Sequence, residues 1–202
     1  MSLDKLLKEL SAKYSNDYYI YMDIDGVIFK SCDAIVEILN EKYGTNKTGQ
    51  DVTDWNFNNI VPNLTDEQIE ELFECEQFFD IVKTNPLAIK FLEEHRDRTM
   101  LVTSGSPKNY MLKRQWFDDY GLSDIPIISV PHSLKKTVIN MDRHNTGHKW
   151  TMFVDDSKAN LQLFCNRTYP NFLVQFLEYD DGKNEQREWV KNWGGETVTS
   201  FY

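Results

Sequence analysis

From residue 99 onward, short apolar runs that favour β-strands alternate with segments of helical periodicity. Strands are expected at residues 99–103, 125–130, 150–154 and 172–179, and helices at 107–119, 157–166 and 184–193. Strands that alternate with helices in this way predict a mostly parallel sheet with helices on both faces. The sequence therefore indicates an α/β fold of the Rossmann-like type, in which helices flank a parallel sheet.

The N-terminal part of the chain adds one helix and one strand. Leucines recur at helical spacing over residues 3–13, and the β-prone run 18–22 stops at Asp23. Residues 31–90 then break the strand–helix rhythm, because they contain helical and irregular segments but no good strand. We expect residues 31–90 to form a small helical cap inserted after the first strand, and residues 1–30 and 91–202 to form the α/β core.

Local signals mark the organisation of the expected cap. The stretch from Thr65 to Gln68 matches a capping box, and Asn85-Pro86 looks like an N-cap followed by proline at the first helical position. Residues 45–64 carry Trp55 and Phe57 among turn residues without a clear period. We therefore expect helices to begin after Thr65 and Asn85, separated from the first cap helix by an irregular segment.

The net charge limits the partners that the chain can bind. Its 202 residues carry a formal net charge of −10. An acidic protein repels the backbone of duplex nucleic acid and anionic lipid, so we expect neither duplex nucleic acid nor a membrane as a partner. A small phosphorylated substrate is compatible with this charge, because a bound metal ion can outweigh a distant net charge. The sequence leaves the oligomeric state open.

Cysteine usage and hydropathy indicate the compartment. The three cysteines, Cys32, Cys75 and Cys165, are odd in number and form no CxxC pair, so neither a disulfide framework nor a zinc site is expected. The N-terminal stretch lacks the apolar run of a signal peptide, and no apolar run is long enough to span a bilayer. We therefore expect a cytoplasmic protein.

Polar residues follow three of the expected strands at the point where each strand ends. The first strand runs into Asp23-Ile24-Asp25-Gly26, the second into Thr103-Ser104-Gly105, and the fourth into Asp155-Asp156. Ligands of open α/β sheets bind outside the carboxyl ends of the strands. These three clusters should therefore meet at one edge of the sheet and form a site.

Each of these groups has a use in phosphoryl transfer. One carboxylate can attack phosphorus to form an aspartyl-phosphate, and a second can protonate the leaving oxygen and later deprotonate water. Mg²⁺ would separate such acids from a dianionic phosphate, since it favours a few carboxylates with water and phosphate oxygens. The Thr103 hydroxyl and the amides of residues 104–106 can hold phosphoryl oxygens. A lysine would neutralise the remaining charge, and the candidates are Lys135, Lys136 and Lys149.

Three segments resemble motifs of the haloacid dehalogenase (HAD) superfamily. YYIYMDIDGVI resembles the first motif, MLVTS the second and TMFVDDS the fourth, and the resemblance covers about residues 18–160. It implies that Asp23 is the nucleophile, that Asp25 is the general acid/base and that Thr103 binds phosphate. Ser104 and Gly105 would add their amides to the same phosphate site.

The resemblance also implies how the metal and the lysine are placed. Mg²⁺ would be held by four acids, Asp23, Asp25, Asp155 and Asp156. For Asp25, the family commonly uses the main-chain carbonyl. The family carries a lysine ahead of the fourth strand, and we expect Lys136, in SLKKTV, to fill this role rather than the adjacent Lys135 or the more distant Lys149. Asn160 stands where many members have a further acid, so the groups behind the metal ligands are expected to be neutral.

Each motif taken alone has a plainer interpretation. DxDG could be a calcium loop, but an EF-hand register from Asp23 puts Ala34 where a bidentate glutamate is needed, so that interpretation fails. It could also be an ordinary strand-to-turn exit, and Asp155-Asp156 could be a turn or a helix cap. The specificity lies in the three motifs occurring together in the right order.

Aromatic residues of the expected cap suggest a class of substrate. Most of them should form the cap's own small core, but Trp55 and Phe57 lie in an irregular segment and are predicted to contact substrate. The segment LVTSGSPKNYMLKRQWFDDYGL is loosely similar to the 5'-deoxyribonucleotidase branch of the family. It favours nucleoside 5'-monophosphates as substrates. The alternatives are a phosphatase acting on nucleic-acid or protein phosphate ends, a non-catalytic HAD-like binding protein, and a mutase or phosphotransferase.

Overall fold

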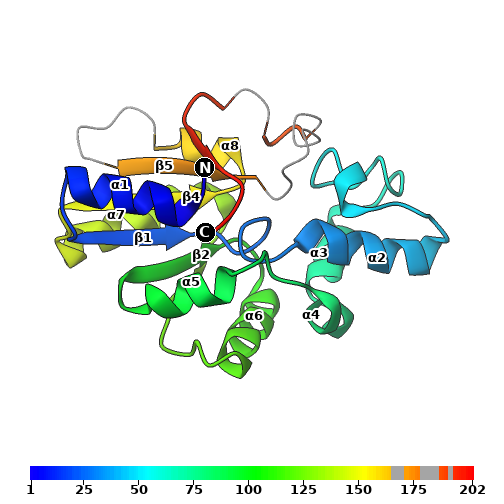
Figure 1. Cartoon of the computed structure of the whole chain (residues 1–202). Coiled ribbons are helices and arrows are strands. Elements are labelled where there is room, and N and C mark those ends of the chain that lie inside the picture. The colour runs from blue at the N-terminus through cyan, green and yellow to red at the C-terminus, as the bar shows by residue number, and fades with distance from the viewer. Residues whose placement is uncertain (165–170, 178–186, 191–192) are drawn as a thin grey trace.

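The computed structural model describes residues 1–164, 171–177, 187–190 and 193–202. The described residues form a six-stranded sheet in which every paired strand is parallel, in the order β3-β2-β1-β4-β5-β6 (Figure 1). The strands are β1 (Tyr18–Met22), β2 (Thr99–Thr103), β3 (Ile127–Ser129), β4 (Trp150–Asp155), β5 (Asn171–Phe176) and β6 (Glu196–Val198). The predicted Rossmann-like α/β fold is confirmed.

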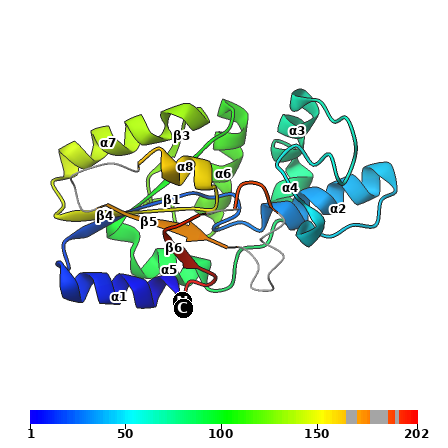
Figure 2. The same cartoon turned by 90° about the horizontal axis from the view of Figure 1, so that it is seen from above.

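Helices cover both faces of the sheet, because successive residues of each buried strand point to opposite sides. On one face, Ile20 and Met22 of β1 pack into a core with three helices, α1 (Leu3–Lys13), α5 (Ala88–Glu94) and α6 (Pro107–Asp119). On the other face, Tyr21 and Phe153 pack with two helices, α7 (Lys135–Thr146) and α8 (Lys158–Gln162). Figure 2 shows the sheet between α1 and α5 on one side and α7 and α8 on the other.

A group of helices lies beyond the carboxyl end of β1, to one side of the sheet in both views (Figures 1 and 2). It contains α2 (Ser31–Tyr43), the 3-10 turn η1 (Gly49–Asp51), α3 (Asp66–Phe73) and α4 (Glu76–Ile81), and we call it the helical module. The capping box predicted at Thr65 and Gln68 is confirmed at the start of α3. The buried side chains of the module join the core on the α1 face of the sheet.

The two connections between the helical module and the sheet run side by side. Lys30 N donates to Lys83 O at 2.8 Å, and Asn85 N donates to Ile28 O at 2.8 Å. The Asn85 side chain donates to the carbonyl of Val27 at 2.6 Å, so it does not cap a helix as expected. α5 instead begins at Ala88, after Leu87 in a left-handed conformation.

Several elements differ from the sequence-based expectation. The expected division at residue 90 falls inside α5, whose buried Phe91 and Leu92 pack in the sheet-side core, so the 31–90 cap boundary stays a prediction. α4, α7 and β6 were not expected. The helix expected over 184–193 lies largely outside the described residues, and its described part, residues 187–190, contains a turn. The remaining short 3-10 helices are η2 (Arg96–Arg98) and η3 (His132–Leu134).

The ends of the described chain are tied together. Leu3 N donates to Ser200 O at 2.8 Å and Asp4 N to Phe201 O at 2.9 Å, and both termini lie close together in Figure 1. Cys32 is buried and Cys75 half-buried, both as free thiols, whereas Cys165 lies outside the described residues. Among the described helices, none combines the length and apolar character needed to cross a bilayer.

Candidate active site

The carboxyl ends of β1 and β4 bring two predicted site acids into contact with one lysine. Asp23 N donates to Val154 O at 2.9 Å, which keeps the chain after β1 alongside β4. The Lys135 ammonium then lies 2.6 Å from Asp23 Oδ2 and 3.2 Å from Asp155 Oδ2. All three side chains are buried, so their charges interact without much screening by water.

The lysine that contacts these acids is Lys135 and not Lys136, which was expected to do so. Lys135 is the first residue of α7 and is 1% exposed, whereas Lys136 is half-buried and Lys149 is exposed. Neighbouring residues of a helix point about 100° apart, so only one of two adjacent lysines can face the acids. The sequence did not reveal where α7 begins, and the choice between the two lysines depends on that position.

Three acids could hold a metal ion. Asp23, Asp155 and Asp156 are buried, and each offers a carboxylate oxygen within 4.8 Å of those of the others. Hard carboxylate oxygens in this number suit Mg²⁺. Gly26 keeps the space open, because a Cβ at this position would lie 2.5 Å from Asp156 Oδ2, and its φ of +73° is one that other residues rarely adopt.

Asp155 is held in place by several donors. Asn160 Nδ2 lies 2.9 Å from both of its carboxylate oxygens, and Ser157 N donates to Oδ1 at 2.9 Å. Asn160 thus supplies a neutral donor group behind the acid. The arrangement orients Asp155 without adding negative charge to the site.

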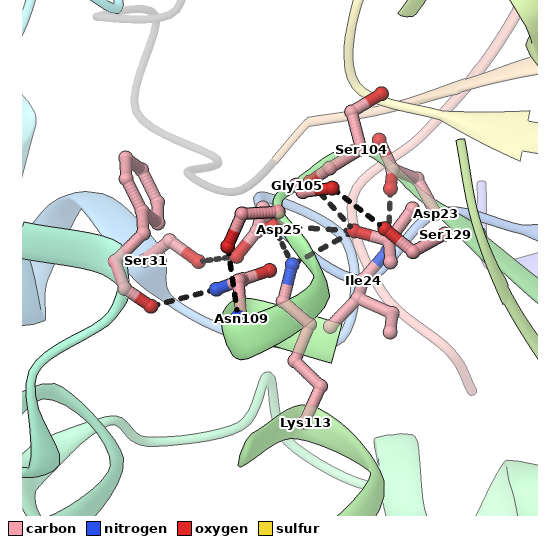
Figure 3. Close-up of polar contacts among 12 residues, drawn as sticks. Asp23, Ile24, Asp25, Ser31, Ser104, Gly105, Asn109, Lys113 and Ser129 are labelled. Atoms are coloured by element: carbon pink, nitrogen blue, oxygen red, sulfur yellow. Dashed lines mark hydrogen bonds and ion pairs between the residues drawn. The ribbon is translucent and has the colours of Figure 1, made fainter. Parts of the chain in front are cut away.

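Asp25 has a different environment from the other three acids. One of its oxygens accepts a hydrogen bond from Ser31 Oγ at 2.7 Å, and the other accepts one from Lys113 Nζ at 2.5 Å (Figure 3). Its carboxylate is not a member of the three-acid cluster found among the described residues. A role for its main-chain carbonyl in metal binding stays a prediction.

Lys113 is a site residue that the sequence reasoning missed. It lies on α6, is 0% exposed, and donates to Thr103 Oγ1 at 2.8 Å as well as to Asp25. The sequence could have indicated that Lys113 is buried, because Asn109, Lys113 and Trp116 recur at helical spacing and share one buried face of α6. A lysine in such a stripe must have a partner in the interior.

Burial and the neighbouring charges change the protonation of the central pair. Burial raises the pKa of Asp23 to about 7, and the Asp155 and Asp25 carboxylates add to this rise against the opposing effect of Lys135. Burial alone would lower the pKa of Lys135, but the Asp155 and Asp23 carboxylates outweigh it and raise that pKa above its usual value. Lys135 therefore stays charged, while Asp23 in the metal-free site resists ionisation.

A cavity of about 390 Å³ opens over these residues. Its floor includes Asp23, Asp25, Lys135 and Asp156, and its opposite wall comes from the helical module through Trp55, Ile69, Glu70, Phe73 and Glu74. Three residues of the lining each carry a buried polar atom with no hydrogen-bond partner within the described part of the chain: Ser104 Oγ, Asn109 Oδ1 and Asn160 Oδ1. Unpaired buried groups of this kind favour a polar ligand or ordered water in the cavity.

Some of the predicted substrate-binding residues line the cavity, and others are buried away from it. Trp55, Ser104 and Gly105 line the cavity. Phe57 does not, because it is 0% exposed and packs edge-on behind Trp55 with ring centroids 6.0 Å apart, so its predicted substrate contact is wrong. Thr103 is also fully buried, with its hydroxyl between Lys113 and Asp25, and its contact with phosphate stays a prediction.

The helical module is anchored over the cavity by contacts with the sheet-side core. Asn109 Nδ2 donates to Phe73 O at 2.6 Å, and Ser106 Oγ donates to Glu74 at the end of α3. On the opposite side, the centroids of the Trp189 and Trp55 rings lie 4.9 Å apart. The main-chain carbonyl of Trp189 accepts a hydrogen bond from Lys158 N at 2.8 Å. The cavity wall is thus joined to the core from both sides.

Comparison with solved structures places the fold in the HAD-like hydrolases. A haloacid dehalogenase-like family protein from Streptococcus pneumoniae aligns at 12% identity with a TM-score of 0.57, over 89% of this chain and 92% of that one. A haloacid dehalogenase-like hydrolase from Burkholderia xenovorans LB400 aligns at 12% identity and a TM-score of 0.58, over 91% and 92% of the two chains. A HAD family hydrolase from Deinococcus radiodurans, determined with bound phosphate and sodium, aligns at 12% identity and 0.55, over 91% of each. At these identities the likeness shows the fold.

The family match together with the fold shows a HAD-type phosphatase. A search of curated proteins found no match. A family model described as "5' nucleotidase, deoxy (Pyrimidine), cytosolic type C protein" matches residues 17–198, which is most of the chain. The chain therefore belongs to this 5'-nucleotidase family of HAD-like enzymes, and the resemblance expected from its motifs is confirmed.

Proposed function

We propose that the chain is a Mg²⁺-dependent phosphomonoester hydrolase that acts on nucleoside 5'-monophosphates through an aspartyl-phosphate on Asp23. The observation that carries the proposal is the contact of Lys135 with both Asp23 and Asp155, since Lys135 and Asp23 line the open cavity. This arrangement provides a nucleophile, a fixed positive charge and metal-ligand oxygens at one point. When bound by Asp23, Asp155 and Asp156, Mg²⁺ would neutralise charge on the phosphoryl group.

The first half-reaction uses Asp23 and Asp25. A carboxylate oxygen of Asp23 forms a bond to phosphorus as the bond between phosphorus and the ester oxygen breaks. The ester oxygen keeps the electron pair and takes a proton from the Asp25 carboxyl. Lys135 stabilises the charge on the phosphoryl oxygens, as do the amides of residues 104–106 at the start of α6.

The second half-reaction restores the enzyme. Asp25, now a carboxylate, takes a proton from a water molecule as the water oxygen bonds to phosphorus. The bond from Asp23 to phosphorus breaks, and inorganic phosphate leaves. Ser104 lines the cavity, and its buried hydroxyl has no partner among the described residues, which supports a hydrogen bond from it to a phosphoryl oxygen.

The cavity wall supports a nucleoside as the leaving group. Trp55 and Phe73 offer aromatic surface opposite the acids, and a base can stack on such surface. A volume of about 390 Å³ falls in the range of small-ligand sites. The enclosing module and the net charge of −10 both disfavour a macromolecular phosphate end. Membership in a family described as 5' nucleotidases agrees with the proposal.

The test measures phosphate release from a panel of phosphomonoesters with Mg²⁺ or with EDTA, for the wild type and Asp23→Asn. We expect Mg²⁺-dependent release that is fastest with nucleoside 5'-monophosphates and is absent in the variant. Turnover by Asp23→Asn would show that another group is the nucleophile. Equal rates for sugar phosphates and nucleotides would refute the substrate class, and binding without turnover would favour a non-catalytic protein.

A further inference from the structure

A buried lysine connects two of the predicted catalytic motifs. Lys113 Nζ lies 2.5 Å from Asp25 Oδ2, which follows β1, and 2.8 Å from Thr103 Oγ1, at the end of β2. The lysine itself comes from neither strand but from α6, one turn further along than Asn109. Figure 3 shows its side chain rising from α6 toward Asp25.

Lys113 is buried together with the partners that a buried ammonium requires. Its side chain is 0% exposed, and a buried ammonium is destabilising unless charges and hydrogen-bond acceptors surround it. Asp25 supplies the charge and Thr103 a second acceptor. Lys113 is not among the described residues that line the cavity, and its two hydrogen bonds go to Asp25 and Thr103.

The Asp25 carboxylate is consequently held from two sides. Ser31, the first residue of α2, donates to Oδ1 at 2.7 Å, and Lys113 donates to Oδ2. A carboxyl that must deliver a proton to one oxygen of the substrate works only in a narrow range of orientations. Two donors on opposite oxygens restrict that range.

Thr103 is oriented by the same ammonium. Because Thr103 Oγ1 accepts a hydrogen bond from Lys113, its own hydroxyl proton is left to be donated elsewhere. In the structure the acceptors within reach of that proton are Asp25 Oδ2 at 3.5 Å and Ser104 O at 3.4 Å. Lys113 thus sets the direction of a hydroxyl at the loop that leads into the cavity.

We propose that Lys113 is a positioning residue, which fixes Asp25 for proton transfer to the leaving group and Thr103 at the phosphate loop, without contacting the substrate. This inference rests on the proposed function, since it assigns Asp25 the role of general acid. It predicts that loss of Lys113 impairs mainly those substrates whose leaving oxygen needs a proton. Substrates with a leaving group that departs as a stable anion should be affected far less.

The experiment compares Lys113→Met with the wild type on a nucleoside 5'-monophosphate and on p-nitrophenyl phosphate. Methionine keeps most of the apolar stem but has neither charge nor donor. The quantity to compare is kcat/KM, because it reports only the steps up to formation of the aspartyl-phosphate. We expect kcat/KM to fall about 10²-fold for the nucleotide, and by less than about tenfold for p-nitrophenyl phosphate.

The two substrates also separate the half-reactions. Asp25 must still activate water in the second half-reaction, so kcat for p-nitrophenyl phosphate should fall even where its kcat/KM does not. Lys108→Met provides the matched control, because Lys108 is an exposed lysine on the same helix and should change neither constant. If Lys113→Met does not fold, Lys113→Gln retains a donor on a chain one bond shorter, and should show a smaller loss with the same selectivity.

The outcomes distinguish this inference from the proposed function. A wild type without Mg²⁺-dependent turnover of either substrate would overturn the proposed function and the inference with it. An active wild type whose folded Lys113 variant loses kcat/KM equally for both substrates, or loses none, would overturn the inference alone. In that case Lys113 would be a structural ion-pair partner.

Discussion

Lys135 Nζ lies 2.6 Å from Asp23 Oδ2 and donates a hydrogen bond to it, deep in the protein where both side chains are shielded from water. The two residues are 112 positions apart in sequence, with the helical module, β2 and β3 between them, and the order of the strands in the sheet brings them together. Their contact places a permanent positive charge beside the proposed nucleophile, where a phosphoryl group would carry its negative charge.

The two adjacent lysines give a sharp test of this contact. Lys135→Met should lower kcat/KM on the order of 10³-fold, because a preorganised positive charge at the phosphoryl group is lost. Lys136→Met should change kcat/KM less than about twofold, since Lys136 is half-buried and lies about 100° around α7 from Lys135. Steady-state kinetics of both variants on one nucleoside 5'-monophosphate would measure these changes in kcat/KM. A larger loss in the Lys136 variant would contradict the placement of α7.

Gly26 offers a steric test of the acid cluster. Gly26→Ala would put a methyl group 2.5 Å from Asp156 Oδ2, so the variant should bind Mg²⁺ more weakly and lose most activity. Gly44→Ala is the matched control, because Gly44 has a similar φ of +68° but no atom within 4 Å of the added Cβ. Both variants should lose about 1 kcal/mol of stability to backbone strain.

The measurement for this pair is Mg²⁺ affinity by calorimetry, together with thermal unfolding. Weakened Mg²⁺ binding confined to the Gly26 variant would support Asp156 as a metal ligand. If both variants bound Mg²⁺ like the wild type, the cluster of Asp23, Asp155 and Asp156 would not be the metal site.

The raised pKa of Asp23 predicts a pH-dependent stability in the absence of metal. In the unfolded chain this group titrates near 3.8, and in the fold its pKa is about 7, so the folded state favours the protonated form. The resulting stabilisation is fully present below pH 3.8 and is lost as the pH rises through about 7. At pH 8 the metal-free fold therefore bears the full penalty of a buried charge.

Asp23→Asn removes that charge and so reports on it. In EDTA at pH 8 the variant should have a Tm higher than the wild type, on the order of 5 °C, with the difference shrinking toward pH 5. Added Mg²⁺ should raise the Tm of the wild type but much less that of the variant. Equal Tm values for the two proteins at pH 8 without metal would contradict the assigned environment of Asp23.

Substitution of Trp55 should change KM for nucleotides, whereas substitution of Phe57 should change thermal stability. Trp55→Ala removes a cavity wall, so KM for nucleotides should rise by about 5- to 150-fold, the range of one stacked base, with little change for p-nitrophenyl phosphate. Phe57→Leu alters a fully buried ring and should lower the Tm while leaving KM unchanged. A rise in KM only for the Phe57 variant would reverse the assignment of the substrate wall.

Much of the fold could be predicted because its strands are buried on both faces. Such strands appear as continuous apolar runs, as in Tyr18–Met22 and Thr99–Thr103, and their ends coincide with Asp23 and Thr103. β6 escaped prediction because its three residues, Glu196–Val198, lie at a sheet edge with two of the three exposed. α7 escaped because its polar, weakly patterned sequence resembles a loop.

The candidate site residues that come directly after strands could be predicted from the sequence. Those whose position depends on the orientation of a helix could not. The acids Asp23, Asp155 and Asp156 sit at strand ends, so parallel order alone brings them together. The choice between Lys135 and Lys136 depends on the rotation of α7, and the role of Lys113 on which face of α6 is buried. Neither follows from local residue preferences, since a lysine in a helix is usually exposed.

The most direct measurement traps the covalent enzyme. Wild type mixed with substrate and Mg²⁺ is quenched in acid and treated with borohydride, which reduces an aspartyl-phosphate to homoserine, and the peptides are then analysed by mass spectrometry. We predict homoserine at position 23 alone, only when both substrate and Mg²⁺ were present. Sustained turnover with the modification at another acid, or with none, would contradict Asp23 as the nucleophile.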